Sequence, residues 1–370
     1  MARTKQLPDM ALATRWPHRF LDLLPASWKR GYLLRQSGGE SAGEVFTLTE
    51  KLHGAKRFLI SWPEKGENLL IAYPAMRVLR EATGPDAVYV HLVSAGLAAA
   101  VAELFPGEQI LSWSRTELAW HEPSVQAIKT SLQVFAPQVS LNLMHPVPSV
   151  LSALIKASGA GLRMALSVPG AEAGADSAAL LTETEPYANV QLQAALGSPW
   201  AGHYFQFLNS WRYAGFSMQE TWTAFGNDGD ASGITEAWAG SNASPEQTWL
   251  YIHDVSDTSR TLDDDFYSWL WEKIQMRETE DVSIVMVVLN SIGTSLVREG
   301  RWRNVPVLKA SSLSEYSSLV SPARGVAAFQ GWGLHMASLA EVRCLALLRR
   351  EEAAYDVSKW NPLFEVEWVA

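Results

Sequence analysis

The sequence of 370 residues contains a single cysteine, Cys344. One thiol excludes an internal disulfide framework and a zinc site built on several cysteines. The sequence also lacks any run of about 18 apolar residues, the length that a membrane-spanning helix requires. Its first residues, MARTKQLPDMALATRW, are too polar for the apolar core of a secretory signal peptide. We therefore expect a cytoplasmic protein.

Positive charge is also scarce. Thirty Lys and Arg residues stand against 39 Asp and Glu residues, which gives a net charge of −9. This balance argues against nucleic acid as a partner, because non-specific binding needs a basic surface. Hydrophobic residues make up 48% of the chain and charged residues 19%. That composition is typical of a globular protein, and the length is sufficient for two domains.

Common catalytic motifs are missing as well. There is no GxxxxGK[ST], GxSxG or HExxH, and no GxGxxG follows a predicted strand. The eight histidines are dispersed, and no pair has the spacing of metal ligands. P-loop, serine-hydrolase and ordinary metalloenzyme interpretations are therefore excluded, and we expect neither a bound metal ion nor a cofactor.

Short apolar runs alternate with helical patterns from residue 55 onward. Strands are predicted at 56–62, 86–94, 108–114, 138–144, 248–255 and 281–290, with helices between most of them, such as PSVQAIKTSLQVF at 123–135. The segments VPVLKA, LSEYSSLV, GVAAFQ, GLHMASLAEV and RCLALLR complete the series. This alternation predicts an α/β fold of the GT-B type, with two Rossmann-like, doubly wound parallel sheets that face a central cleft. We expect an extension at 1–50, a first domain at 51–225, a linker at 226–247 and a second domain at 248–370. Pro74 predicts a kink or a late start of the first helix.

The N-terminal extension is basic and apolar. Between Arg3 and Arg35 it carries seven Lys or Arg residues against Asp9 and Asp22, and apolar residues accompany them at 15–36. One interpretation is peripheral contact with the inner face of an anionic membrane. The alternative is that this segment packs onto the body of the protein.

The first candidate site is the corner PEKGEN, between the first strand and the first helix. Glu67 follows Gly66 at a helix N-terminus, where the dipole stabilises a carboxylate that can serve as a base. The alternative is an ordinary helix-terminal charge, with Asn68 as a plain N-cap.

The second candidate site is the turn QGWG, which leads from an apolar strand into a helix. Gln330, Gly331 and Gly333 would let a phosphate approach backbone N–H groups, and His335 could reach a phosphate or a hydroxyl. A structural role for the histidine is the competing interpretation.

The order of these segments resembles glycosyltransferase family 9, the ADP-heptose:lipopolysaccharide heptosyltransferases, over residues 55 to 365. FLISWPEKGENLLIAYPAMRVLRE has the layout of the family's first strand and helix, with Pro74-Ala75-Met76 in place of Pro-Ala-Leu. QGWGLHMASLA occupies the place of the family's Asp-(Ser/Thr)-Gly turn and the histidine that follows it. The resemblance implies a GT-B fold and inverting, metal-independent transfer from a nucleotide sugar to a cell-envelope glycan or another acceptor.

Several family positions have changed. The catalytic Asp of the family aligns with Asn68 or, with one inserted residue, with Glu67. Its Lys-Arg pair, which meets the donor phosphates, becomes Ser259-Arg260, and its Asp-Ser-Gly turn becomes Gln330-Gly331-Trp332.

Two hypotheses follow from these changes. In an active transferase, Glu67 would act as the base while Arg260, His335 and the helix N-terminus near Gly333 stabilise the leaving diphosphate. In a catalytically inactive GT-B protein, the chain would bind or assemble with a partner. The two differ in one visible respect, because a cleft filled by Trp332 would rule out the transferase.

Overall fold

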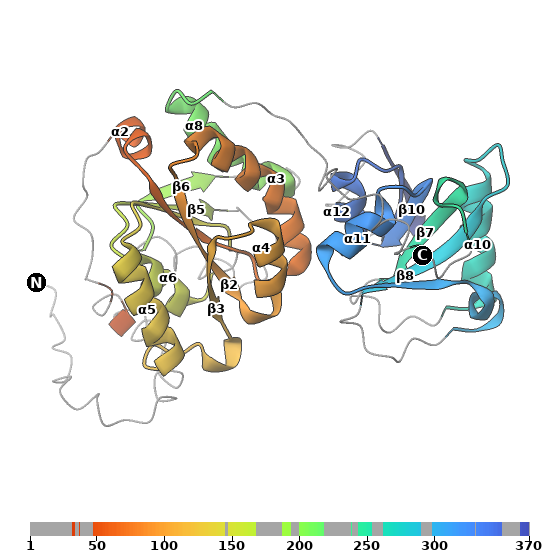
Figure 1. Cartoon of the computed structure of the whole chain (residues 1–370), viewed down its shortest axis with the longest axis horizontal. Helices are drawn as coiled ribbons and strands as arrows, with labels where there is room; N and C mark the ends of the chain where they lie inside the picture. Colours follow the sequence, from red (N-terminus) through yellow and green to blue (C-terminus); the bar gives the residue numbers. More distant parts are fainter. Residues whose placement is uncertain are drawn as a thin grey trace, which may run out of the picture.

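The computed structural model describes residues 32–33, 37, 47–144, 147–167, 187–193, 200–217, 238, 243–253, 262–289, 298–329, 331–349 and 363–369. They build two α/β halves, each on its own six-stranded sheet with parallel strand pairs throughout. The two halves lie side by side along the longest axis of the molecule (Figure 1). The predicted pair of doubly wound sheets is confirmed.

The N-terminal half contains the first sheet. Its strands are β1 (Arg57–Ser61), β2 (Val88–Ser94), β3 (Gln109–Trp113), β4 (Val139–Asn142), β5 (Leu162–Ser167) and β6 (Val190–Gln193). Its helices are α2 (Leu48–His53), α3 (Gly66–Thr83), α4 (Ala98–Leu104), α5 (Pro123–Phe135), α6 (Ser149–Ala157) and α8 (Trp200–Tyr213). Two hydrophobic clusters cover the two faces of this sheet, as expected for strands buried on both sides.

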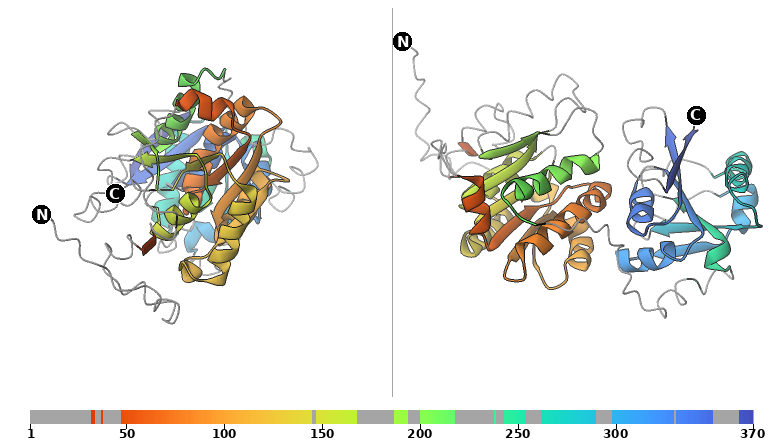
Figure 2. Two further views of the ribbon diagram at one scale, coloured as in Figure 1. Left: turned by 90° about the vertical axis from the view of Figure 1, so that its left-hand side faces the viewer. Right: turned by 90° about the horizontal axis from the view of Figure 1, so that it is seen from above.

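The C-terminal half contains the second sheet. Its strands are β7 (Thr248–His253), β8 (Ser283–Leu289), β9 (Val307–Ala310), β10 (Gly325–Phe329), β11 (Cys344–Arg349) and β12 (Phe364–Val369). Its helices are α10 (Asp264–Gln275), α11 (Leu313–Val320) and α12 (Trp332–Leu339). Figure 2 shows from two further directions how the helices flank this sheet.

Both sheets share one topology. The first has the order β3-β2-β1-β4-β5-β6, and the second has the order β12-β11-β10-β7-β8-β9. Each order reverses direction next to the first strand of its half, between β1 and β4 and between β7 and β10. Ligands of doubly wound sheets bind outside the carboxyl ends of the strands at such a switch point. The turns after β1 and β10 are therefore the places to look for a site.

Helix α3 differs from the prediction in two respects, which concern Pro74 and Asn68. The helix begins at Gly66 and runs without interruption through Pro74, so a late start is wrong. Its N-cap residue is Lys65, and Asn68 is the third residue of the first turn. The interpretation of Asn68 as the N-cap is therefore also wrong.

Two residues of the N-terminal extension are buried on the body of the protein. Tyr32 and Leu33 belong to the same cluster as Trp113 and Trp120, and the Tyr32 hydroxyl is hydrogen bonded to His121. These two side chains are therefore used in packing, as the second interpretation of this segment predicts. Within the described residues, no helix has both the length and the apolar character needed to cross a membrane.

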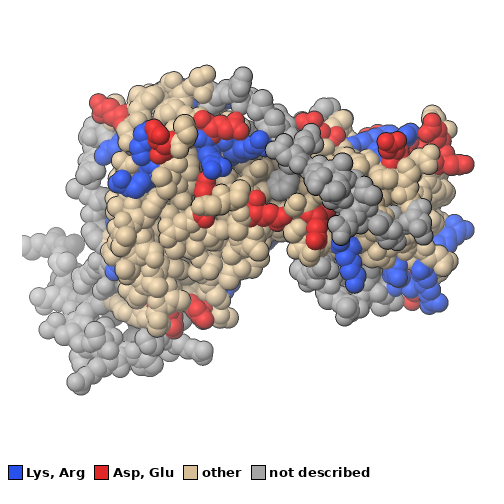
Figure 3. Space-filling view, in the orientation of Figure 1, with Lys and Arg blue, Asp and Glu red and all other residues tan. Residues whose placement is uncertain are grey.

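The surface charges are mixed. On the visible face, Lys and Arg side chains alternate with Asp and Glu, and a broad lower part of the N-terminal half carries few charges (Figure 3). Where it is formed by described residues, this face shows no broad basic area of the kind that binds a nucleic-acid backbone.

Candidate functional site

The corner after β1 is held by contacts on both of its sides. The Trp62 indole N–H donates to Nδ1 of the fully buried His91 at 2.8 Å. Nε2 of His91 in turn donates to Glu108 at 2.6 Å, so the imidazole is the Nε2–H tautomer. Two residues after Trp62, Glu64 forms an ion pair with Arg115. The path of the chain into α3 is thus fixed before the first helical residue.

Gly66 meets the other half of the molecule at this corner. The ring of Trp332, the first residue of α12, lies against the α-carbon of Gly66, and a β-carbon there would overlap the ring. Helix α12 packs on α3 around this point, as the neighbouring positions of the two helices in Figure 1 also indicate. The turns at the two switch points therefore touch each other, and the indole lies between them.

Glu67 is half-buried in the first turn of α3. It is close enough to the fully buried Tyr204 of α8 to influence that phenol. Burial raises the pKa of Tyr204, and the negative charge of Glu67 raises it further. Asn68, one residue on, is also half-buried. A carboxylate is thus retained at the corner, beside the Trp332 contact.

Gly331 and Gly333 have structural uses in the second turn. Gly331 is the N-cap of α12 with φ 152° and ψ −157°, a conformation that is essentially restricted to glycine. A β-carbon on Gly333 would lie 2.9 Å from side-chain carbons of Ile252 and Ala328. Gly333 is therefore required for the close packing of α12 on its sheet, whatever else its N–H group does.

His335 is buried inside the C-terminal half. Only 7% of the residue is exposed, and loss of solvation lowers its pKa to about 4. The imidazole is therefore neutral near pH 7 and brings no positive charge to a diphosphate. Arg260 and Gln330, the two other residues predicted to bind a donor, lie outside the described residues.

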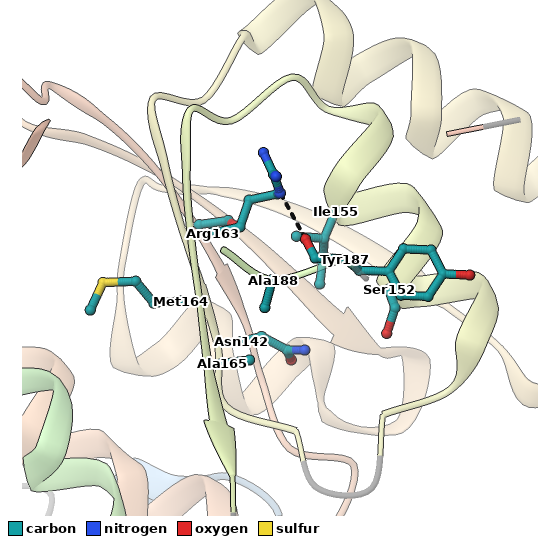
Figure 4. Close-up of a pocket in the computed structure, with 9 residues that line it drawn as sticks. Asn142, Ser152, Ile155, Arg163, Met164, Ala165, Tyr187 and Ala188 are labelled. Carbon is teal, nitrogen blue, oxygen red and sulfur yellow. Dashed lines mark hydrogen bonds between the residues drawn. The ribbon is translucent and has the colours of Figure 1, made fainter. Parts of the chain in front are cut away.

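A small cavity lies elsewhere in the N-terminal half, between the sheet and α6 (Figure 4). Its volume is about 10 Å³, close to that of one water molecule and too small for a sugar. Ser140 and Ser152 line it, and within the described part of the chain their hydroxyl groups make no hydrogen bond. The Arg163 guanidinium turns aside to donate to the Tyr187 carbonyl at 2.7 Å. We assign no substrate to this cavity.

Among the residues that the structure describes, no group of three His, Cys, Asp or Glu side chains has the arrangement of a metal site.

Two doubly wound halves with facing switch points define a protein of the GT-B fold. The glycosyltransferase family 9 protein from Veillonella parvula superposes with a TM-score of 0.58 at 11% identity, over 85% of this chain and 86% of its own. The E. coli heptosyltransferase WaaC with ADP-2-deoxy-2-fluoro heptose gives 0.55 at 14% identity, over 84% and 92%. E. coli ADP-heptose lps heptosyltransferase II gives 0.55 at 10% identity, over 85% and 90%. The resemblance to family 9 is therefore confirmed for the fold.

No family model and no curated protein matches the sequence itself. The likeness thus concerns architecture, and the chemistry of this chain must be argued from its own residues.

Proposed function

We propose that this protein is a GT-B-fold module that acts by binding or assembly and does not transfer sugar. The observation that carries the proposal is the indole of Trp332 against Gly66. In a doubly wound fold a ligand binds at the switch point, and here two switch-point turns are packed against each other. A nucleoside diphosphate at the start of α12 would have to displace the Trp332 indole from an apolar interface.

The electrostatics of the described residues support the same proposal. Transfer from a nucleotide sugar requires groups that stabilise the negative charge on the leaving diphosphate. His335 is buried and neutral, so it cannot supply a positive charge in this arrangement. Gly333, at the helix start that would face the diphosphate, is in close contact with Ile252.

An inverting, metal-independent transferase is the second candidate. The retained carboxylate of Glu67 at the first corner favours it, because such a reaction needs a base beside the acceptor hydroxyl. The donor would be a nucleotide sugar and the acceptor a cell-envelope glycan or another molecule, at the inner face of the membrane. This reaction would require the two halves to separate at Trp332 before a donor binds.

Turnover distinguishes the two candidates. The purified full-length chain is incubated with a panel of ADP-, UDP- and GDP-sugars, with and without envelope extract, and the released nucleoside diphosphate is measured. The binding module releases none above the level of a heat-denatured sample. Release that is lost in Glu67→Gln and kept in the exposed-site variant Glu117→Gln would establish the transferase instead.

A further inference from the structure

A second contact joins the two halves at the first turn of α11. Glu103, from α4 of the N-terminal half, accepts hydrogen bonds from the backbone N–H groups of Leu313 and Ser314. The distances are 2.9 Å and 2.6 Å, one to each carboxylate oxygen. Leu313 and Ser314 are the first two residues of α11, in the C-terminal half. A carboxylate from one half thus occupies the helix N-terminus of the other.

The first N–H groups of a helix have no partner within the helix, and the N-cap side chain usually satisfies one of them. In α11 the N-cap Ser312 serves only the third residue, since its hydroxyl accepts from the Glu315 N–H at 3.1 Å. The N–H groups of Leu313 and Ser314 are satisfied by Glu103. The cap of this helix is therefore complete only while the halves stay together.

The Glu103 cap on α11 lies at a different place in the interface between the halves from the Trp332–Gly66 contact. Helix α4 meets α11, while α3 meets α12 through Trp332 and Gly66. The Glu103 contact lies apart from the packing of α12 on α3, so it adds a second constraint on the relative orientation of the two halves. Glu103 supplies a directional, charge-assisted contact beside an apolar one.

We infer that Glu103 is a latch that holds the two halves of the chain in one relative orientation. When its carboxylate leaves α11, the first turn of α11 loses two hydrogen bonds and the halves become free to separate at the Trp332 contact. The inference goes beyond the proposed function and does not depend on it. A latch can operate in a binding module and in a transferase alike.

The test compares full-length wild type with Glu103→Ala, Glu103→Gln and the control Glu117→Gln. Glu117 is an exposed acid on the same half. Hydrogen exchange is followed by mass spectrometry, and the radius of gyration is measured by X-ray scattering.

In Glu103→Ala we expect exchange at least tenfold faster at Leu313 and Ser314. We also expect faster exchange at the start of α3 and α12, together with a larger radius of gyration. Glu103→Gln, which keeps one acceptor oxygen, falls between, and Glu117→Gln behaves as wild type.

The inference is overturned if faster exchange in Glu103→Ala is confined to the first turn of α11 while the radius is unchanged, because Glu103 is then only a local cap. It is also overturned if neither variant differs from wild type. If Glu103→Ala does not fold, Glu103→Gln decides between the same outcomes. No nucleotide sugar is present in these experiments, so their failure is distinct from a failure of the proposed function.

Discussion

The contact between Gly66 and Trp332 depends on the large indole of Trp332 and on the lack of a side chain at Gly66. The ring lies on the α-carbon of Gly66, so any side chain at residue 66 would compete with the indole for the same space. The usual reason for glycine, a positive φ, does not apply to Gly66. An alanine there would be tolerated by the helix itself, which makes the substitution a selective probe of the contact.

Gly66→Ala should therefore lower the free energy of unfolding by about 1–3 kcal/mol through overpacking against Trp332. The double variant Gly66→Ala/Trp332→Ala should be no less stable than Trp332→Ala alone, since the added methyl group then has room. Chemical denaturation followed by circular dichroism measures this double-mutant cycle. Gly96→Ala, at an exposed position where a β-carbon meets nothing within 4 Å, is the matched control. Additive effects of the two substitutions would mean that the side chains do not touch.

His335 gives a prediction about pH. Its pKa is about 4 in the folded protein against 6.5 for an exposed histidine, so the unfolded chain binds more protons between these values. The contribution of the buried, neutral His335 to the free energy of unfolding is fully present above pH 6.5. It is lost as the pH falls toward 4, by about 1.4 kcal/mol per pH unit. Because Gln does not titrate, the unfolding free energy of His335→Gln should fall less steeply than that of wild type as the pH is lowered between these values, and the two slopes should differ by this amount. Parallel profiles of the two proteins between pH 4.5 and about 6.5 would contradict the buried, neutral histidine.

At the scale of elements, a buried carboxylate holds together the amino ends of the central strands of the second sheet. The side chain of Glu278 is 1% exposed and accepts from Arg324 at 2.8 Å, from Arg343 at 3.2 Å and from the Trp249 indole at 2.8 Å. Arg324 immediately precedes β10, while Arg343 immediately precedes β11, and Trp249 lies in β7. One acid therefore connects the end of α10 to the beginnings of three strands.

Glu278→Gln should destabilise the protein by about 3 kcal/mol, because two arginines lose the charge that they surround. This value is the lower end of the destabilisation expected when one partner of a buried ion pair is removed, because each arginine side chain is about one-third exposed. Glu280→Gln is the control, because Glu280 is 66% exposed and lies 3.8 Å from Arg324. It should change stability by less than about 0.5 kcal/mol. Equal effects of the two substitutions in a thermal unfolding experiment would refute this account of Glu278.

Helix α6 carries a polar group in an unfavourable place. The Ser152 hydroxyl is buried beside the small cavity without a hydrogen bond in the described structure. Ser152→Ala removes it and raises helix propensity, so we expect stabilisation by about 1 kcal/mol. Ser140→Ala, in β4, tests burial without the helical contribution. A loss of stability in both variants would show that the hydroxyl groups have partners.

The sequence predicted most of the elements because strands buried on both faces appear as short apolar runs between helices. The segment PSVQAIKTSLQVF corresponds to α5 from its first residue to its last. Strands β6 and β12 were missed because the prediction relied on continuous apolar runs, whereas VQLQ and FEVEWV alternate polar with apolar residues, the pattern of half-exposed strands. Helix α3 was predicted with a doubtful start because Pro74 is unusual inside a helix.

The site was less predictable than the fold, for a reason that belongs to the whole molecule. The two switch-point turns can be found from local patterns, and both Gly66 and Trp332 stand out in the sequence. Their contact depends on how the two halves meet, which no local pattern encodes. The same holds for Glu103, which is an unremarkable helical acid until α11 is placed beside it.

The central claim is that the indole of Trp332 fills the place where a GT-B protein would hold its donor. Titration calorimetry of the full-length protein with ADP- and UDP-sugars tests it most directly, supported by the thermal midpoint at the same ligand concentrations. A donor present at a hundred times its Kd would stabilise the protein by about 2.7 kcal/mol, a shift that is readily measured. The account predicts no saturable heat and no change in midpoint for wild type. Saturable binding of a nucleotide sugar to the wild-type protein would contradict it.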